Sequence, residues 1–169
     1  MSQTAFFEAL DRLSTGERAV LRRAAGQTFR ETDVRAMAAF YRCLPWDNSV
    51  NRFSEDRWFA AACFHCLWEA GSGPRLPLER IMRELKEKSD SMEHRLSSLL
   101  DQSWEEDGYL LTKLSRIVKM ARQQGYCADC DSLLEDLLHW NSDTQYVQRR
   151  WARAMYYNKE NEMRDDHAL

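Results

Sequence analysis

Two stretches of the sequence concentrate positive charge without any acidic residue, although the whole chain has a formal net charge of -3. Such a row of cations on one side of a helix can neutralise successive phosphates and release their counterions. The residues concerned are Lys113, Arg116, Lys119 and Arg122 in segment 108–124, and Arg149, Arg150 and Arg153 in segment 147–157, VQRRWARAMYY. This pattern predicts sequence-independent binding of a polyanion along one face of the protein.

A third basic segment, around Arg18, Arg22 and Arg23, contains only Glu17 as an opposing acid. The alternative interpretation is that these arginines are surface residues that pair with acids from neighbouring helices. The presence of three basic helices in one chain favours binding of a polyanion over this alternative. The arginines of segment 147–157 are expected to face solvent, so that replacing them by alanine should leave folding nearly unaffected.

The cysteines could hold a metal or do redox chemistry, because four of the five form two CxxC pairs. Two such pairs could supply the four soft ligands of a tetrahedral zinc site. However, Cys63 and Cys66 lie within an apolar helical segment, where cysteine behaves as a small hydrophobic residue. Cys127 and Cys130 lie at a helix start. We therefore predict structural free thiols and no metal.

No arrangement typical of an enzyme is found in the sequence. His65 lies on an apolar helix, His94 and His139 have no nucleophile or carboxylate at catalytic spacing, and no Gly-rich phosphate loop or HExxH motif occurs. Four aromatic residues could stack nucleic-acid bases, although at helical spacing beside leucines such residues are more often in the core. They are Trp140, Trp151, Tyr156 and Tyr157.

The elements that position these residues are predicted to be helices, because apolar residues recur with a helical period and strand-like alternation is absent. Capping signals occur at Ser14 with Glu17, Asp33, Ser54, Asp90 with Glu93, and Asp107. The expected helices span 4–13, 15–25, 34–44, 55–70, 78–88, 92–102, 108–124, 131–140 and 144–158, and the acidic tail is expected to fray. The predicted fold class is all-α, with about nine helices and no sheet.

Two packed helical bundles are predicted, with an N-terminal bundle at 1–88 and a C-terminal bundle at 89–169 that includes the tail. The loop GSGPRLP at 71–77 is an alternative boundary. The start of the chain lacks a signal-peptide pattern, and the longest apolar run is too short to cross a bilayer. A cytoplasmic protein without membrane contact is expected.

Several segments in order along the chain resemble the CasB family, the small subunit of the type I-E CRISPR surveillance complex Cascade. The resemblance runs from about residue 5 to 157, and its motifs are RAVLRRAAG, DVRAMAAFYRCLP, FAAACFHCLW, HRLSSLLDQ, LLTKLSRIVKMARQQG and LLEDLLHWNSDTQYVQRRWARAMY. The spacing from FYR to RRWAR is the most specific part. The two CxxC pairs and the acidic tail match no motif of this family.

The resemblance implies an all-helical, non-catalytic subunit without a cofactor. Its implied partners are other Cascade subunits beside the crRNA backbone, a second copy of itself, and the displaced single-stranded DNA, whose binding holds the R-loop open. The nucleic-acid-binding residues that it implies, together with Arg122 from the same basic helix, are Arg22, Arg23, Arg52, Lys113, Arg116, Lys119, Arg122, Arg149, Arg150 and Arg153.

One rival hypothesis is a helical protein-interaction module whose basic strip docks on an acidic protein partner. In that case Trp46, Trp58 or Trp68, if exposed, would be natural anchors. A thiol or zinc protein built on the CxxC pairs is the second rival.

Overall fold

Helix-start signals in the sequence coincide with helix N-termini in the computed structural model, which describes residues 3–45, 50–68 and 73–157. The Ser14 hydroxyl accepts a hydrogen bond from the backbone N–H of Glu17 at 3.2 Å, and the Asp33 carboxylate accepts one from Ala36 at 2.9 Å. Ser54 occupies the predicted cap position, but its hydroxyl donates to a backbone carbonyl of the preceding turn. The Ser14 and Asp33 caps satisfy N–H groups that a helix leaves unpaired in its first turn.

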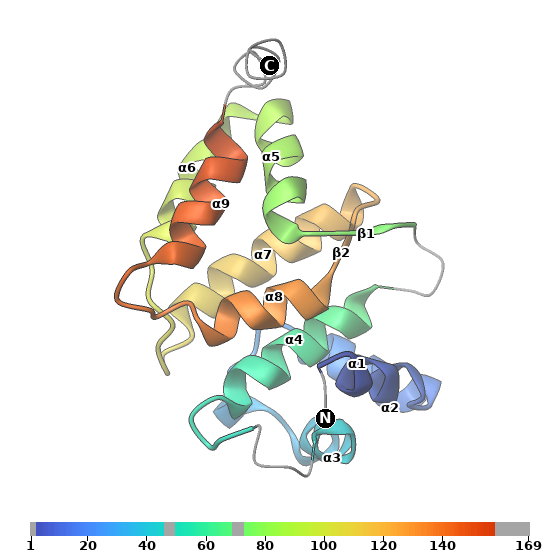
Figure 1. Cartoon of the computed structure of the whole chain (residues 1–169). Helices are drawn as coiled ribbons and strands as arrows, with labels where there is room; N and C mark the ends of the chain where they lie inside the picture. Colours follow the sequence, from blue (N-terminus) through green and yellow to red (C-terminus); the bar gives the residue numbers. More distant parts are fainter. Residues whose placement is uncertain (1–2, 46–49, 69–72, 158–169) are drawn as a thin grey trace, which may run out of the picture.

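Within the described ranges the chain forms nine α-helices, one short 3-10 helix and two strands (Figure 1). In chain order the elements are α1 (Gln3–Asp11), α2 (Thr15–Arg23), η1 (Phe29–Glu31), α3 (Val34–Cys43), α4 (Glu55–Leu67), β1 (Arg75–Leu76), α5 (Leu78–Lys88), α6 (Asp90–Leu100), α7 (Tyr109–Gln123), β2 (Cys127–Ala128), α8 (Cys130–Leu138) and α9 (Tyr146–Tyr156). The predicted all-α class and the number of helices are confirmed. The acidic tail, whose fraying was predicted, lies outside the described residues.

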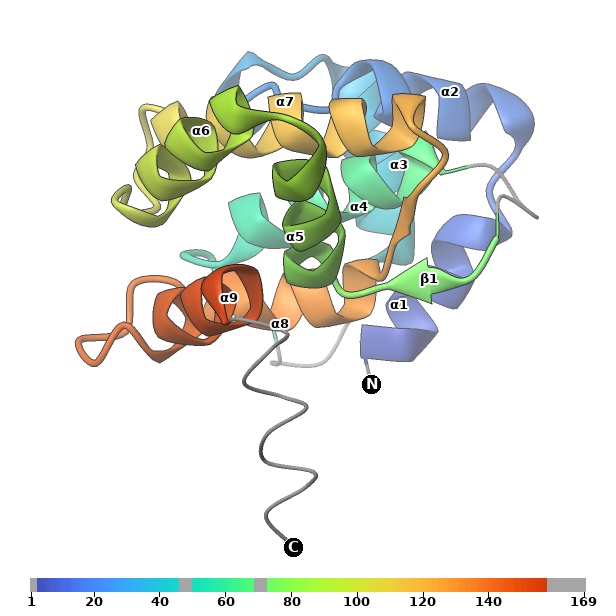
Figure 2. The same cartoon turned by 90° about the horizontal axis from the view of Figure 1, so that it is seen from above.

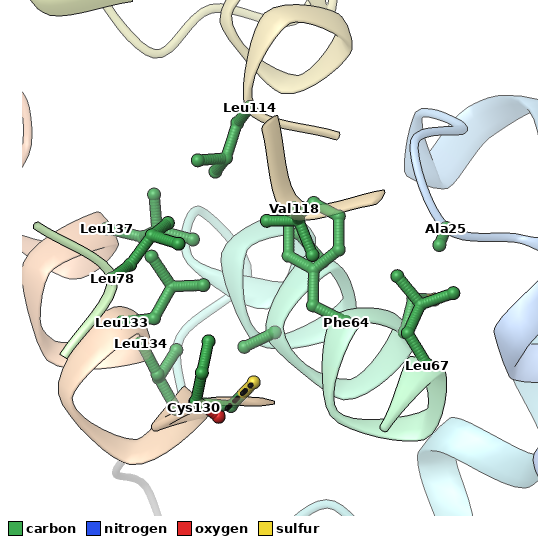
Figure 3. Packing of buried hydrophobic residues seen from close by; sticks show 14 of the residues in the cluster. Ala25, Phe64, Leu67, Leu78, Leu114, Val118, Cys130, Leu133, Leu134 and Leu137 are labelled. Atoms are coloured by element: carbon green, nitrogen blue, oxygen red, sulfur yellow. Dashed lines mark hydrogen bonds between the residues drawn. The ribbon is translucent and has the colours of Figure 1, made fainter. Parts of the chain in front are cut away.

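Helix α4 is the centre of the fold. Every residue from Trp58 to Leu67 is buried, because α2 packs on one side of the helix and α8 on the other. Figures 1 and 2 place α1, α2 and α3 at one end of the molecule, and α5, α6 and α9 at the other. Figure 3 shows Phe64 of α4 in one hydrophobic cluster with Val118 of α7 and Leu134 of α8. The apolar helical segment that carries Cys63 and Cys66 is thus buried at the centre of the core.

Among residues 3–45, 50–68 and 73–157, the expectation of no sheet holds except for one short parallel pair. Arg75 of β1 pairs with Cys127 of β2, and Leu76 pairs with Ala128. The backbone N–H of Asp129 extends this contact by donating to Leu76 O at 2.8 Å. Two residues per strand are too few for an alternating pattern, so no periodicity in the sequence could have indicated the pairing.

Packing in the structure crosses the predicted boundary between residues 88 and 89. Helix α4 contacts α7 and α8, and α5 packs mainly against α9. The buried apolar residues from both halves belong to a single cluster. The division into two bundles stays a prediction, which an unfolding experiment can test. None of the described helices has the length and hydropathy needed to cross a lipid bilayer.

Candidate nucleic-acid interface

The basic residues predicted from the sequence are distributed over two sides of the molecule. Helices α2 and α7 run along one side in Figure 2, whereas α9 lies with α8 on the opposite side. Helix α7 packs against α4, and α9 packs against α5, so the exposed surfaces of α7 and α9 face in different directions. The expected single basic face is therefore replaced by two surfaces, which we call the α2–α7 face and the α9 face.

On the α2–α7 face, two lysines are held in position by uncharged groups. Lys113 donates to the Ser98 hydroxyl, and its Nζ lies 4.8 Å from the centre of the Tyr109 ring. Lys119 Nζ donates to the backbone carbonyl of Ala25 at 3.2 Å. None of these contacts supplies a negative charge. The two cations are consequently positioned but remain able to bind an anion.

Arg23, Arg116 and Arg122 are exposed on the same two helices. The helices approach closely where α2 ends, because Gly26 adopts a φ of +92° that favours glycine. A Cβ atom at Gly26 would lie 2.5 Å from Ser115 Oγ, so only glycine permits this approach. This close contact brings the end of α2 beside Lys119.

Arg22 has a structural contact that the sequence did not reveal. Its Nε donates to the backbone carbonyl of Cys66 at 3.1 Å, and its side chain is only half-exposed. The carbonyls in the last turn of a helix have no partner within that helix, so Arg22 satisfies one at the end of α4. This contact makes Arg22 a connection between α2 and α4.

On the α9 face, Arg150 is neutralised by carboxylates. It donates to the buried Asp136 of α8, and its Nε lies 3.9 Å from Glu79 Oε1 of α5. Asp136 also accepts a hydrogen bond from Trp151 Nε1 at 2.8 Å. Arg150 is exposed as expected, with half of its side-chain surface open to solvent, but it also pairs with a buried acid on α8, which the sequence did not reveal. Replacing Arg150 would therefore disturb folding.

Arg149 and Arg153 remain exposed on α9, and the guanidinium carbon of Arg153 lies 5.7 Å from the centre of the Tyr157 ring. Arg52 lines a cavity of about 490 Å³, to which Leu111 of α7 also contributes. The residues lining this cavity carry both signs of charge: Arg30, Arg52 and Arg57 lie with Glu55, Asp56, Glu105 and Glu106. The mixed charge makes the Arg52 site a poor phosphate site.

The tryptophans that the structure describes are core residues, as the helical spacing beside leucines favoured. Trp140 and Trp151 are buried and pack edge to face with a centroid distance of 5.1 Å, so they cannot stack bases. Trp58 and Trp68 are also buried and cannot anchor a partner, while Trp46 lies outside the described residues. Tyr156 is partly exposed. The sequence reasoning missed Tyr109, although its position four residues before Lys113 indicates that the two share a helix face.

All five cysteines are buried free thiols. Burial raises the pKa of Cys43 to about 11 and that of Cys66 to about 12. Thiols with such pKa values are poor nucleophiles, because the reactive form is the thiolate. Within residues 3–45, 50–68 and 73–157, no group of three or more His, Cys, Asp or Glu side chains could hold a metal ion. The cysteines serve as core residues in α3, α4, β2 and α8.

His65 has partners that its position on an apolar helix did not indicate. Its Nε2 lies 2.8 Å from Asp11 Oδ1, and its Nδ1 lies 2.7 Å from Arg75 Nη1. Because Arg75 can only donate, Nδ1 must accept and Nε2 must carry the proton of a neutral ring. Burial lowers the pKa of His65, an effect that Asp11 opposes and that Arg75 and Arg18 increase.

Because the pKa of His65 is lower in the folded than in the unfolded protein, we expect the free energy of unfolding to decrease as pH falls below about 6.5. The unfolded histidine binds a proton in that range, whereas the folded one stays neutral until lower pH. Urea unfolding at pH 7.5 and 5.5 would measure the change, and His65→Gln should reduce it. His94→Ala, on an exposed side chain, serves as the control. Equal pH dependence in wild type and His65→Gln would contradict this assignment.

The fold and these surfaces define an all-helical protein that presents positioned cations on its exterior. The chain belongs to the CRISPR-associated protein Cse2 family, whose sequence model matches residues 17–157. A search of curated protein sequences gives no significant match.

Solved structures with the same fold include a Cse2-family protein from Thermus thermophilus, at 26% identity and a TM-score of 0.73, covering 94% of this chain and 100% of that one. M. ruber CasB is similar at 24% identity and a TM-score of 0.71, covering 98% and 97%. A chain of a CRISPR RNA-guided surveillance complex matches at 22% identity and a TM-score of 0.69, covering 96% and 93%.

Proposed function

We propose that this protein is a non-catalytic subunit of a CRISPR RNA-guided surveillance complex that stabilises the R-loop by binding the displaced DNA strand. Membership of the Cse2 family and the similarity to a chain of such a complex support the assembly. In the assembly its partners are the other subunits around the crRNA and a second copy of the chain. The observation that best supports binding of DNA is the set of positioned cations on the α2–α7 face.

The chemistry of the α2–α7 face suits a phosphate backbone. Helix α7 has 15 residues and no acid, and Lys113 and Lys119 are held by a hydroxyl and a carbonyl. Positioned cations need little reorganisation to meet phosphates, and counterion release drives such binding without reading base sequence. On the α9 face, by contrast, Arg150 already has carboxylate partners. We therefore assign the displaced strand to the α2–α7 face.

Replacing Lys113, Arg116 and Lys119 together by glutamine should weaken binding of single-stranded DNA by the full chain. Glutamine keeps much of the side-chain length and a hydrogen-bond donor, so the contacts to Ser98 and Ala25 can persist. Loss of three phosphate contacts should reduce the slope of log affinity against log salt by roughly 2, at about 0.7 per contact for a single strand. The measurement is a salt titration of binding, followed by R-loop lifetime in the assembled complex.

The matched control is Arg149→Gln with Arg153→Gln, which removes exposed charge from the α9 face and leaves Arg150 paired. Under the proposal this double variant keeps the salt slope on single-stranded DNA. If the α7 variant assembles at normal stoichiometry and holds the displaced strand as well as wild type, the assignment is wrong. The rival function, docking of the basic strip on an acidic protein, predicts instead that the α7 variant fails to assemble while its residual DNA binding is unchanged.

A further inference from the structure

Tyr109 is an exposed aromatic ring at the start of the basic row on α7. The residue is 55% exposed, unlike Trp140 and Trp151, which are buried. It is the first residue of α7, so Tyr109, Lys113 and Arg116 follow one another on the same side of the helix at spacings of four and three residues. A planar apolar ring therefore lies in line with cations that can bind phosphates.

Lys113, the first cation of this row, contacts the Tyr109 ring. Its Nζ lies 4.8 Å from the ring centre, a distance at which a cation is attracted to the electron-rich face of an aromatic ring. The same ammonium group donates to Ser98 on α6. Lys113 therefore contacts both Ser98 and the Tyr109 ring, and links the ring to the row of cations.

The charge around Tyr109 favours a base over a phosphate at this position. Glu105, Glu106 and Asp107 directly precede the helix, and the Asp107 carboxylate accepts a hydrogen bond from the Tyr109 backbone N–H at 3.0 Å. Glu106 is paired with Arg30 at 2.8 Å, but Glu105 and Asp107 disfavour a phosphate at the N-terminal end of α7, whereas the cations attract phosphates from Lys113 onwards. An uncharged base can lie over the ring without meeting this repulsion.

We infer that Tyr109 stacks against an unpaired base of the bound strand, so that the α2–α7 face selects single-stranded over duplex nucleic acid. This inference rests on the proposed function and adds to it the feature by which the strand is recognised. Bases of a duplex are already stacked on each other and cannot cover a protein ring. Stacking on an aromatic side chain tolerates any base, because every base has a flat π face.

Other exposed aromatic residues fit this role less well. Tyr146 on the α9 face is followed by the exposed Arg149 and Arg153, but its ring centre lies 6.1 Å from that of His139, and the adjoining Arg150 is paired with carboxylates. Phe53 is 87% exposed but borders the cavity whose lining carries both signs of charge. Tyr109 is favoured because it begins a helix without acids, on which Lys113 and Lys119 are held by uncharged groups.

The test compares binding of the full chain to a thymidine oligonucleotide, to an abasic strand with the same number of phosphates, and to a duplex of equal length. Wild type should bind the thymidine strand about tenfold more tightly than the abasic one. Tyr109→Ala should abolish this difference without changing the salt slope, and Tyr109→Phe should retain it. Tyr146→Ala, a tyrosine of similar exposure on the α9 face, should also retain it.

The two possible failures are distinguishable. If wild type binds the abasic strand as tightly as the thymidine strand, with a steep salt dependence, the stacking inference is overturned and the proposed function stands. The same holds if Tyr109→Ala keeps the tenfold difference. If wild type binds neither strand, even at low salt, both the inference and the DNA contact on which it rests are overturned.

Discussion

Replacing Phe64 by alanine is expected to lower the free energy of unfolding by about 4 kcal/mol, within the range measured for removing a buried phenylalanine. Phe64 has no exposed surface and lies on α4, between α7 and α8 (Figure 3). The substitution removes a large apolar side chain and leaves a cavity that helices packed on both sides of α4 cannot easily fill. Urea unfolding followed by circular dichroism measures the loss.

The control for this substitution is Phe53→Ala, which removes the same ring from a site that is 87% exposed. It should change stability by less than about 0.5 kcal/mol. A loss below about 1 kcal/mol for Phe64→Ala would mean that α4 is not the centre of the core. The same experiment tests the division at residue 88: one transition at all wavelengths indicates one cooperative unit, whereas two transitions indicate two bundles.

The helices could be predicted because each depends mainly on local sequence. A helical period of apolar residues and a capping side chain three residues ahead of a backbone N–H are both visible in the sequence, as for Ser14 and Asp33. The β1–β2 pair could not be predicted, because it joins two-residue segments that are far apart in the chain. Its existence depends on where α5 and α8 begin, which tertiary packing decides.

Of the candidate site, only the features that depend on local sequence could be predicted. Sequence alone indicates that Lys113, Arg116 and Lys119 lie on a helix without acids, and the structure agrees. The sequence cannot indicate which helix faces pack together, and this packing decides whether an acid lies within reach of a given cation. Arg149 and Arg150 are neighbours in the sequence and both are exposed, yet Arg150 also contacts a buried carboxylate on α8. The sequence likewise did not reveal that α7 and α9 face different sides of the molecule.

Asp136→Ala is expected to lower the free energy of unfolding by about 3 kcal/mol, because it breaks a buried network that joins three helices. Asp136 of α8 accepts hydrogen bonds from Arg150 and Trp151 of α9, and Arg150 also contacts Glu79 of α5. Removing the carboxylate leaves the buried Trp151 N–H without its acceptor. Urea unfolding measures the loss, and Asp143→Ala, at an exposed acid in the following turn, should change stability by less than about 0.5 kcal/mol.

A double-mutant cycle separates the two contributions to this loss. Arg150→Gln alone should lower the free energy of unfolding by less than Asp136→Ala does. The arginine side chain is 50% exposed, and in its absence the Asp136 carboxylate still accepts a hydrogen bond from Trp151. In the Arg150→Gln background, Asp136→Ala should lower stability only by the loss of the Trp151 hydrogen bond. The stability losses of the two single variants should therefore sum to more than the loss in the double variant. Simple additivity would show that the ion pair contributes nothing. Since the network lies away from α7, the variants that remain folded should bind single-stranded DNA with the wild-type salt slope.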